Sequence, residues 1–338
     1  MKKTSKLLAL LLALAMALSL AACSDSAGGG NSQAPESTAP AEESTAPSQA
    51  AEPAGDETYV VGICQLLPHP ALNAATEGFK DTLKEAFGDA VEIKEGNAGG
   101  DPANCATIID GYVADGVDLI LANATPSLTA AASATNTIPI LGTAVTNYGI
   151  ALNLDSTEDK VLGGNISGTS DLAPLDQQAD MVKELFPDAK NVGLLYCTAE
   201  ANSVYQIETV QGFLEGMGYT CKRYGFNDVN DLAAVTQTAA DESDVIYVPT
   251  DNTAADNAST IADVVIPAKV PVIAGEEGIC GGCGVATLSI SYYEIGQIAG
   301  EMAVQILKGE KSVSEMAIGF DTTLDKKYNP SICEQLGL

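Results

Sequence analysis

The chain has 338 residues, with 16 Lys and Arg against 45 Asp and Glu, and a formal net charge of −29. This charge argues against nucleic acid as a partner, because neutralising phosphates requires a basic surface. A hydrophobic fraction of 46% excludes a wholly disordered chain, and eight cysteines are too few for a small disulfide-built domain.

Residues 1–22 have the features of a secretory signal peptide. A basic start with three lysines precedes an uncharged run over residues 7–20, which suits an h-region and is short for a membrane span. The motif Leu-Ala-Ala-Cys at residues 20–23 resembles the lipobox of bacterial lipoproteins. That resemblance implies cleavage before Cys23, acylation of Cys23 and an extracytoplasmic protein anchored to the plasma membrane. The alternative is an ordinary signal peptide with an incidental cysteine.

The next segment, residues 23–57, is predicted to be the acylated cysteine followed by a disordered linker. Residues 24–57 contain no Val, Ile, Leu, Met, Phe, Tyr, Lys or Arg, and Glu-Ser-Thr-Ala-Pro occurs twice, at 36–40 and 43–47. Such a segment has nothing to bury. The remaining residues, 58–338, carry 13 basic and 38 acidic residues, so the acidity belongs to the folded part.

After residue 58, short apolar runs alternate with longer helical patterns. Strands are predicted at Tyr59–Ile63, Val91–Lys94, Leu119–Leu121, Ile138–Leu141, Asn191–Tyr196, Thr220–Tyr224, Val245–Val248, Val270–Ala274 and Val285–Ser289. Helices are predicted at about 70–87, 102–114, 126–135, 174–186, 202–217, 229–240, 254–266 and 291–308. Apolar strands separated by helices predict an α/β fold with parallel sheets covered on both faces.

The two halves of this region repeat one pattern. Each has a strand, a polar loop, a helix with Gly-Phe (78–79 and 212–213), a second strand and then a polar turn. A region of this length exceeds the usual single core, which favours two similar lobes. Ligands of open α/β sheets bind beyond the carboxyl ends of the strands, so the loops of both lobes are expected to face one cleft.

Residues 58–338 resemble a periplasmic-binding-protein type I domain, and in particular the ABC-transporter substrate-binding lipoproteins associated with aromatic amino acids. The stretches that carry the resemblance are residues 62–70, 97–101, 122–126, 168–171, 200–203, 249–252 and 291–296. The resemblance implies three crossings between lobes, which we place near residues 170, 290 and 320. The N-terminal lobe is then 58–170 plus about 291–320, and the C-terminal lobe is 171–290 plus about 321–338.

Residue types in the loops that follow the strands indicate the ligand. Residues 58–338 hold one arginine, Arg223, inside a predicted strand, so a ligand carboxylate would be held by amides and hydroxyls and a phosphate is disfavoured. The groups proposed for this role are the Ala124 amide, Thr125, Thr143 and Ser170. The alternative is that such residues only cap helices.

Loop carboxylates would pair with an ammonium group, because a buried unpaired ammonium is costly. Asp251 is the first candidate, Glu200 the second and Asp171 a third, whereas Glu276 and its neighbour Glu277 are interpreted as a solvated pair at a loop tip. Donors and acceptors together suit a zwitterion, an amino acid.

The other predicted ligand-binding residues are polar or aromatic and lie near these loops. They are Gln65, His69, Asn97, Asn123, Asn202, Ser203, Asn252 and Tyr292. Stacking on an aromatic ligand is also considered for Leu66, Leu67, Pro68, Tyr148 and Tyr205. For His69, the only histidine, the alternative is a role in its own loop, and for Tyr292 it is packing at the hinge.

Seven cysteines follow Cys23, and Cys280 and Cys283 form a Cys-x-x-Cys motif. The motif lies among glycines between two predicted strands, so we interpret it as a loop disulfide or two thiols rather than a redox centre. One histidine and a single such motif provide too few ligands for a metal site.

The resemblance implies the receptor component of an ABC importer, which passes a small solute to a permease. We expect a monomer without a cofactor. No Gly-x-x-x-x-Gly-Lys motif is present, so ATP hydrolysis requires separate ATPase subunits. An enzyme is not expected, because no Gly-x-Ser-x-Gly motif or metal cluster is present. The alternatives are a sugar or nucleoside receptor of the same fold, a sensor, and a carboxylate-based hydrolase.

Overall fold

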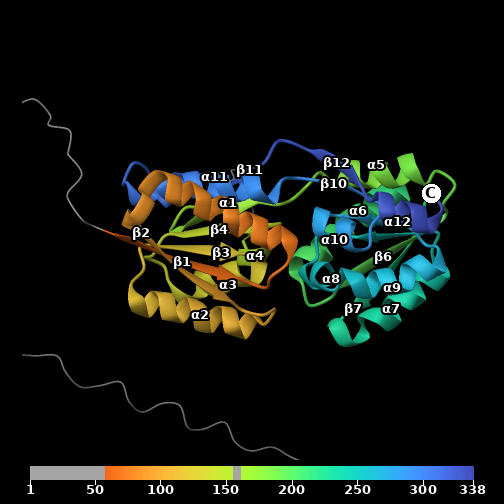
Figure 1. Ribbon diagram of the computed structural model, residues 1–338, viewed down its shortest axis with the longest axis horizontal. Helices are drawn as coiled ribbons and strands as arrows, with labels where there is room; N and C mark the ends of the chain where they lie inside the picture. The colour runs from red at the N-terminus through yellow and green to blue at the C-terminus, as the bar shows by residue number, and fades with distance from the viewer. Residues whose placement is uncertain (1–57, 155–160) are drawn as a thin grey trace, which may run out of the picture. The chain divides into compact units, whose positions relative to one another are not determined.

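The computed structural model describes residues 58–154 and 161–338, which form two six-stranded sheets (Figure 1). The first sheet has the order β11-β5-β4-β3-β1-β2, and all its strand pairs are parallel. The second has the order β12-β10-β9-β8-β6-β7, with one antiparallel pair at its β12 edge. The strands are β1 (Tyr59–Gln65), β2 (Val91–Asn97), β3 (Leu119–Asn123), β4 (Ile140–Val145), β5 (Ile166–Ser170), β6 (Asn191–Cys197), β7 (Thr220–Phe226), β8 (Val245–Val248), β9 (Val272–Ala274), β10 (Ala286–Ser289), β11 (Gly319–Phe320) and β12 (Asp325–Tyr328).

Helices follow most strands. They are α1 (Pro70–Phe87), α2 (Pro102–Asp115), α3 (Thr125–Ala134), α4 (Tyr148–Leu152), α5 (Leu175–Leu185), α6 (Ala201–Gly216), α7 (Val229–Glu242), α8 (Asn252–Asp256), α9 (Ala258–Ala268), α10 (Glu277–Gly282), α11 (Tyr292–Leu307) and α12 (Pro330–Leu336), with 3-10 turns at Gly88–Ala90 and Val313–Glu315. Among the described residues, none of these helices has both the length and the apolar character that crossing a membrane requires.

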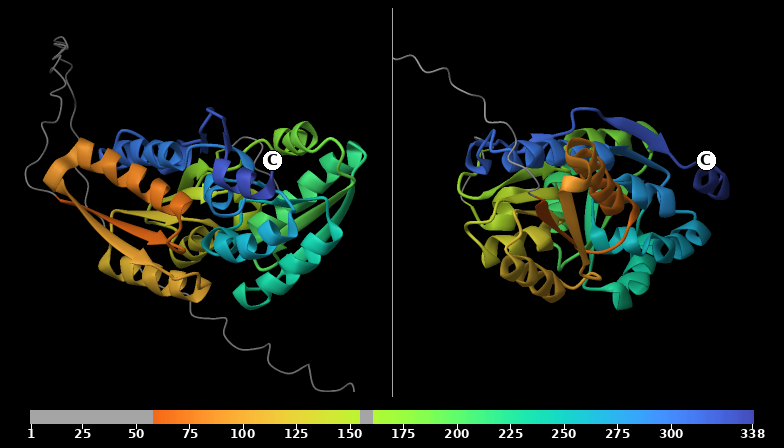
Figure 2. Two further views of the ribbon diagram at one scale, coloured as in Figure 1. Left: turned by 45° about the vertical axis from the view of Figure 1, so that its right-hand side comes forward. Right: turned by 60° about the vertical axis from the view of Figure 1, so that its left-hand side comes forward.

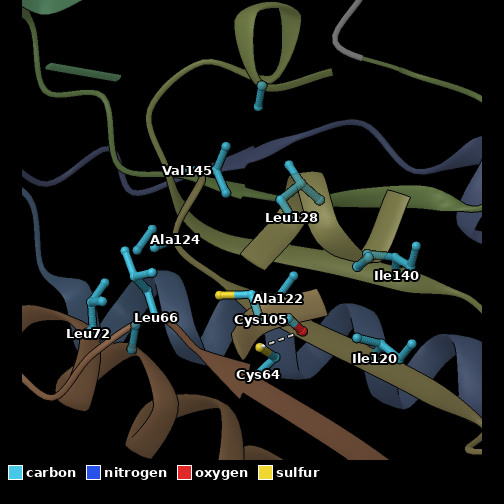
Figure 3. Close-up of a cluster of buried hydrophobic side chains, with 14 of the residues drawn as sticks. Cys64, Leu66, Leu72, Cys105, Ile120, Ala122, Ala124, Leu128, Ile140 and Val145 are labelled. Carbon is cyan, nitrogen blue, oxygen red and sulfur yellow. Dashed lines mark hydrogen bonds between the residues drawn. The ribbon is translucent and has the colours of Figure 1, made fainter. Parts of the chain in front are cut away.

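The first lobe, which we define as the first sheet and its helices, is covered on both faces because its central strands β1, β3 and β4 are mostly apolar and buried. Val61 and Leu119 pack with residues of α1 and α11, whereas Ile120 packs on the other face with α2 and α3. Figure 2 shows these helix pairs on opposite sides of the sheet. Figure 3 shows the second face, where Cys64 and Leu128 lie in one apolar cluster. The alternation of side chains along each strand therefore produces two core layers.

The second lobe, the second sheet and its helices, is built in the same way. Leu195 and Ile246 pack with α7 and α9, while Leu194 and Tyr247 face α5 and α6. Its edge strand β12 is mostly exposed and pairs with β10 alone. The chain passes between the sheets three times: after β5, after β10, and between β11 and β12. The predicted fold class, two α/β lobes with three crossovers, is confirmed.

Two strands begin two residues later than predicted, and both delays have one reason. The predicted starts at Ile138 and Val270 precede prolines, and the strands begin only at Ile140 and Val272. Proline has no N–H to donate to a neighbouring strand, so a ladder starts after it. The helix predicted over 254–266 is divided at Asn257, whose backbone is not helical, into α8 and α9.

Candidate functional site

A small polar cavity lies where loops of both lobes meet. Its lining residues are His69, Leu72, Ala144, Thr146, Asp171, Asn202, Thr250, Asp251, Asn252, Ala255, Glu276 and Tyr292. A larger groove of about 380 Å³ lies on the second lobe alone, among α5, β12 and α12, and its lining is mostly apolar. The cavity between the lobes is the candidate site, because buried polar groups of both lobes converge there.

Three buried carboxylates line this cavity, and no Lys or Arg is among its lining residues. Asp171 accepts hydrogen bonds from the hydroxyls of Thr146, at 2.9 Å, and Tyr292, at 3.0 Å. Asp251 accepts from the backbone N–H of Cys197 at 2.7 Å and caps α8. These bonds hold Asp171 and Asp251 in place.

The pKa of each carboxyl group is raised, with burial as the main cause. The pKa of Asp251 rises to about 8, and the negative charge of Glu200 adds to the effect of burial. The pKa of Glu276 rises to about 7, although Glu276 accepts hydrogen bonds from the N–H groups of Gly278 and Ile279. The pKa of Asp171 is raised as well, while its two hydroxyl donors oppose the shift. A cation in the cavity would stabilise the ionised form of all three.

Glu200 lies behind the cavity wall and organises it. Its carboxylate accepts from the backbone N–H groups of Asn252, at 3.0 Å, and Thr253, at 2.8 Å, at the start of α8. It also accepts from the side-chain amides of Asn252, at 2.7 Å, and Asn202, at 3.2 Å. The charge of Glu200 is therefore used to position two asparagines that do line the cavity.

A hydrogen bond between His69 and Asn252 joins the lobes beside the cavity. Nε2 of His69, in the loop before α1, lies 3.4 Å from Oδ1 of Asn252 at the start of α8. His69 is buried, and burial lowers its pKa. The imidazole is therefore neutral near pH 7.

The structure brings six of the predicted site residues to this cavity and leaves the others away from it. Those that line it are His69, Asp171, Asn202, Asp251, Asn252 and Tyr292. Glu200 and Ser203 lie in the second lobe behind them, both buried. Asn97 accepts a bond from Gly99 and is exposed.

Several predicted residues of the first lobe form hydrogen bonds within that lobe and do not face the cavity. Gln65 donates to the Leu67 carbonyl, and the Asn123 amide donates to Leu72 and Thr76. Neither Gln65 nor Asn123 is a lining residue. The fold satisfies the side chain of Gln65, whereas Oδ1 of Asn123 has no hydrogen-bond partner among the described residues.

The proposed carboxylate-binding set is not supported by the geometry. The N–H of Ala124 donates to the carbonyl of Thr143 at 3.0 Å. Thr143 accepts from Thr169, and Ser170 donates to the carbonyl of Thr146. Thr125 is buried at the start of α3 and is not a lining residue. These groups form hydrogen bonds within the strand pairs and the crossover turns. Residue type and loop position alone do not show that the groups are used in this way.

The prediction for Glu276 was wrong. This residue is 1% exposed and caps α10, whereas Glu277 is only partly buried and pairs with Lys327. Thr146 and Thr250 also line the cavity and were not singled out. The position of Glu276 could have indicated that it lines the cavity. Like Asp251, it is the first carboxylate after a buried strand and precedes a short helix.

Most of the apolar residues considered for stacking belong to the lobe cores. Leu66, Leu67 and Tyr148 are buried in the first lobe, where the Tyr148 hydroxyl donates to the Thr169 carbonyl. Tyr205 packs against the second core. The apolar part of the lining is instead formed by Leu72, Ala144 and Ala255.

The seven cysteines of the described residues are free thiols. Cys280 lies within α10 and Cys283 follows it, so the motif is helical rather than part of a loop. Both are buried, and burial raises the pKa of each, for Cys280 to about 12. Cys23 lies outside the described residues. Among the described residues, no three His, Cys, Asp or Glu side chains are placed to hold a metal ion.

Two α/β lobes joined by three crossovers, with a polar cavity between them, define a binding protein of the periplasmic type. The family model for ABC transporter substrate binding proteins matches residues 60–338, and the chain belongs to this family. Such proteins bind small molecules outside the cytoplasm and work with a permease.

Individual relatives support the assignment. The chain is 36% identical over 269 residues to a tyrosine-binding protein of Clostridioides difficile, covering 79% of this chain and 76% of that protein. An ABC domain from Streptococcus pneumoniae in complex with L-Trp is 31% identical, with a TM-score of 0.79 over 83% of this chain and 95% of that one. The ligand-free, open structure of a Clostridium difficile substrate binding protein with adhesive properties is 34% identical, with a TM-score of 0.65 and the same coverage.

Proposed function

We propose that this protein binds an amino acid, and specifically an aromatic one, in the cavity between its lobes and delivers it to an ABC permease with separate ATPase subunits. The observation that carries the proposal is the set of buried carboxylates, Asp171, Asp251 and Glu276, around a cavity with no Lys or Arg in its lining. A cationic ligand group would stabilise the ionised form of these carboxylates, and the ammonium of an amino acid supplies one.

The ring of an aromatic side chain would find apolar and aromatic neighbours in the same lining. Leu72, Ala144 and Ala255 provide apolar surface, and Tyr292 and His69 provide rings. The two similar proteins described as a tyrosine-binding protein and an L-Trp complex support this class of ligand. Contact of one ligand with both lobes would favour the closed arrangement, since such a ligand binds that state better.

The test is thermal-shift and calorimetric screening of the purified protein against the twenty amino acids, purines and common sugars. We expect a large shift with tyrosine or tryptophan and recovery of the bound ligand unchanged. A shift with sugars only would overturn the amino-acid assignment in favour of a sugar receptor of the same fold. Chemical conversion of the ligand would contradict the assignment as a binding protein.

We also propose the lobe boundaries from the sequence, 58–170 with about 291–320 and 171–290 with about 321–338. The pairing of β11 with β5, and of β12 with β10, supports placing the last boundary near residue 320. We expect a monomer, which sedimentation analysis of the purified domain tests.

For the N-terminal segment we propose lipid anchoring through Cys23. The support is the order of its features: lysines, an uncharged run and Leu-Ala-Ala-Cys at residues 20–23. More than one acyl chain gives stable anchoring, where a single chain binds only marginally. Metabolic labelling with palmitate should mark the wild-type protein and not a Cys23→Ser variant. Labelling of both would contradict the proposal.

A further inference from the structure

The single histidine of the chain, His69, has one ring nitrogen without a partner. Its side chain is 5% exposed and lines the cavity between the lobes. Nδ1 of this ring has no hydrogen-bond partner among the described residues. An unpaired buried polar atom is costly, so its retention at a binding cavity indicates a partner on the ligand.

Hydrogen bonds among three residues determine whether Nδ1 of His69 is a donor or an acceptor. Glu200 accepts from the amide Nδ2 of Asn252 at 2.7 Å, which turns the Asn252 oxygen, Oδ1, toward His69. An amide oxygen only accepts, so the hydrogen must lie on Nε2 of His69, 3.4 Å away. A neutral imidazole carries one ring hydrogen, and burial lowers the pKa of His69 and keeps it neutral. Nδ1 is therefore a bare acceptor, and its partner must be a donor.

The cavity offers the ammonium group other partners. Asp171, Asp251 and Glu276 are buried carboxylates in the same lining. A carboxylate pairs with an ammonium more strongly than a neutral imidazole does, so an amino acid would place its ammonium against a carboxylate and leave Nδ1 to a donor of its side chain.

We propose that Nδ1 of His69 accepts a hydrogen bond from the side chain of the ligand, so that the cavity selects aromatic amino acids carrying a phenol O–H or indole N–H over phenylalanine. The inference rests on the proposed amino-acid function. Asn252 and Glu200 act as positioning residues that fix the tautomer of His69. A site with a buried polar partner rejects the analogue that lacks the matching group, because the partner is then left unpaired.

Calorimetry on matched ligand pairs tests the selection. Tyrosine is compared with phenylalanine, and tryptophan with its benzothienyl analogue, in which sulfur replaces the indole N–H. We expect the ligand without the donor to bind roughly 10- to 100-fold more weakly. A His69→Leu variant should bring the ratio close to one, while Leu72→Met, which alters the same cavity without touching the acceptor, should preserve it.

The chain has one histidine, so NMR of the ¹⁵N-histidine-labelled wild-type protein reports on His69 alone. This measurement requires no variant. We expect the neutral tautomer protonated at Nε2, and a shift of the Nδ1 resonance with tyrosine or tryptophan but not with phenylalanine. An Asn252→Ala variant should show a mixture of tautomers.

Three results would overturn the inference alone: equal affinity for tyrosine and phenylalanine, a proton on Nδ1 in the neutral free protein, or an identical Nδ1 response to both ligands. Failure of every amino acid to bind is a different result. It would overturn the proposed function and this inference with it.

Discussion

The hydroxyl of Tyr292 donates to Oδ2 of Asp171 at 3.0 Å, across 121 positions of sequence. Asp171 directly follows β5, where the chain leaves the first sheet, and Tyr292 opens α11, where the chain returns to it. Both side chains are buried and both line the cavity. One hydrogen bond thus ties two crossovers to each other beside the proposed ligand.

Replacing Tyr292 by phenylalanine should destabilise the protein by about 1–2 kcal/mol. The change leaves the buried Asp171 without one of its two hydroxyl donors, and hydrogen bonds to charged groups contribute more than neutral ones. Urea unfolding measures the loss. Tyr293→Phe is the matched control, because that hydroxyl donates to Asp81 at an exposed site, and it should cost less than about 0.5 kcal/mol. Equal losses in the two variants would contradict the role assigned to Tyr292.

The sequence predicted the elements that have long apolar patterns and missed those that depend on their surroundings. β5 reads Ile-Ser-Gly-Thr-Ser over residues 166–170, with one apolar side chain, and becomes a strand because β4 pairs with it. β12 contains two lysines and an aspartate at an exposed edge. The short helices α4, α10 and α12 lack a full repeat of the helical pattern. The secondary structure of such segments is determined by the elements that they pair or pack with, and the periodicity of a single sequence carries no information on that pairing.

Site residues could be predicted where lying directly after a strand was enough to bring a side chain to the cavity. Asp251 and Asn252 follow β8 directly and do line the cavity. Ala124 follows β3 in the same way, yet its N–H is used by Thr143 of the neighbouring strand. Glu276 lies beside a second glutamate, which favoured a solvated pair, and only the packing around β9 and α10 shows that it is buried. Loop position is visible in sequence, whereas backbone hydrogen-bond use and burial are not.

Ligand affinity should rise with pH as the cavity carboxylates ionise. The pKa of Asp251 is raised to about 8 by burial and by the charge of Glu200, so at pH 6 this carboxyl is mostly protonated in the free protein. An ammonium ligand stabilises the ionised form, so binding must release that proton. Affinity should then fall up to tenfold for each pH unit below about 8. Calorimetry in buffers of different ionisation enthalpy counts the protons released.

An Asp251→Asn variant should bind amino acids at least 100-fold more weakly and show a flatter pH dependence, since the charge that holds the ammonium is gone. Asp263→Asn, an exposed change on α9, is the control and should leave both quantities unchanged. Unchanged affinity in Asp251→Asn would exclude this residue as the partner of the ligand cation.

Glu276 should make the free protein less stable as pH rises. Burial raises its pKa from 4.5 to about 7, so between those values the unfolded chain ionises while the folded protein stays protonated. The free energy of unfolding therefore falls across this window, and the full loss is present above pH 7. Glu276→Gln removes the ionisation, so its stability relative to wild type should improve by about 3 kcal/mol between pH 4.5 and pH 8.

The comparison is made between two pH values because the amide of the Glu276→Gln variant would accept only one of the two backbone bonds that the Glu276 carboxylate accepts. That loss is independent of pH and cancels in the difference. Glu277→Gln, which alters the ion pair with Lys327 at a half-exposed site, is the control and should change by less than about 0.5 kcal/mol. A Glu276→Gln stability difference that does not vary with pH would refute the assignment.

The close contact of α1 and α11 requires glycine at position 296. A Cβ placed on Gly296 would lie 2.1 Å from the carbonyl oxygen of Ala75, which is backbone and cannot move aside alone. Gly296→Ala should therefore destabilise the protein by about 2–4 kcal/mol. Gly111 in α2 is the matched control, since a Cβ there meets nothing within 4 Å. Gly111→Ala should raise the stability by roughly 0.5–1 kcal/mol, because alanine restricts the unfolded chain and favours the helix. Chemical denaturation of both variants measures the two changes in the free energy of unfolding, which should have opposite signs. A neutral or stabilising effect of Gly296→Ala would show that α1 and α11 pack less closely than the structure indicates.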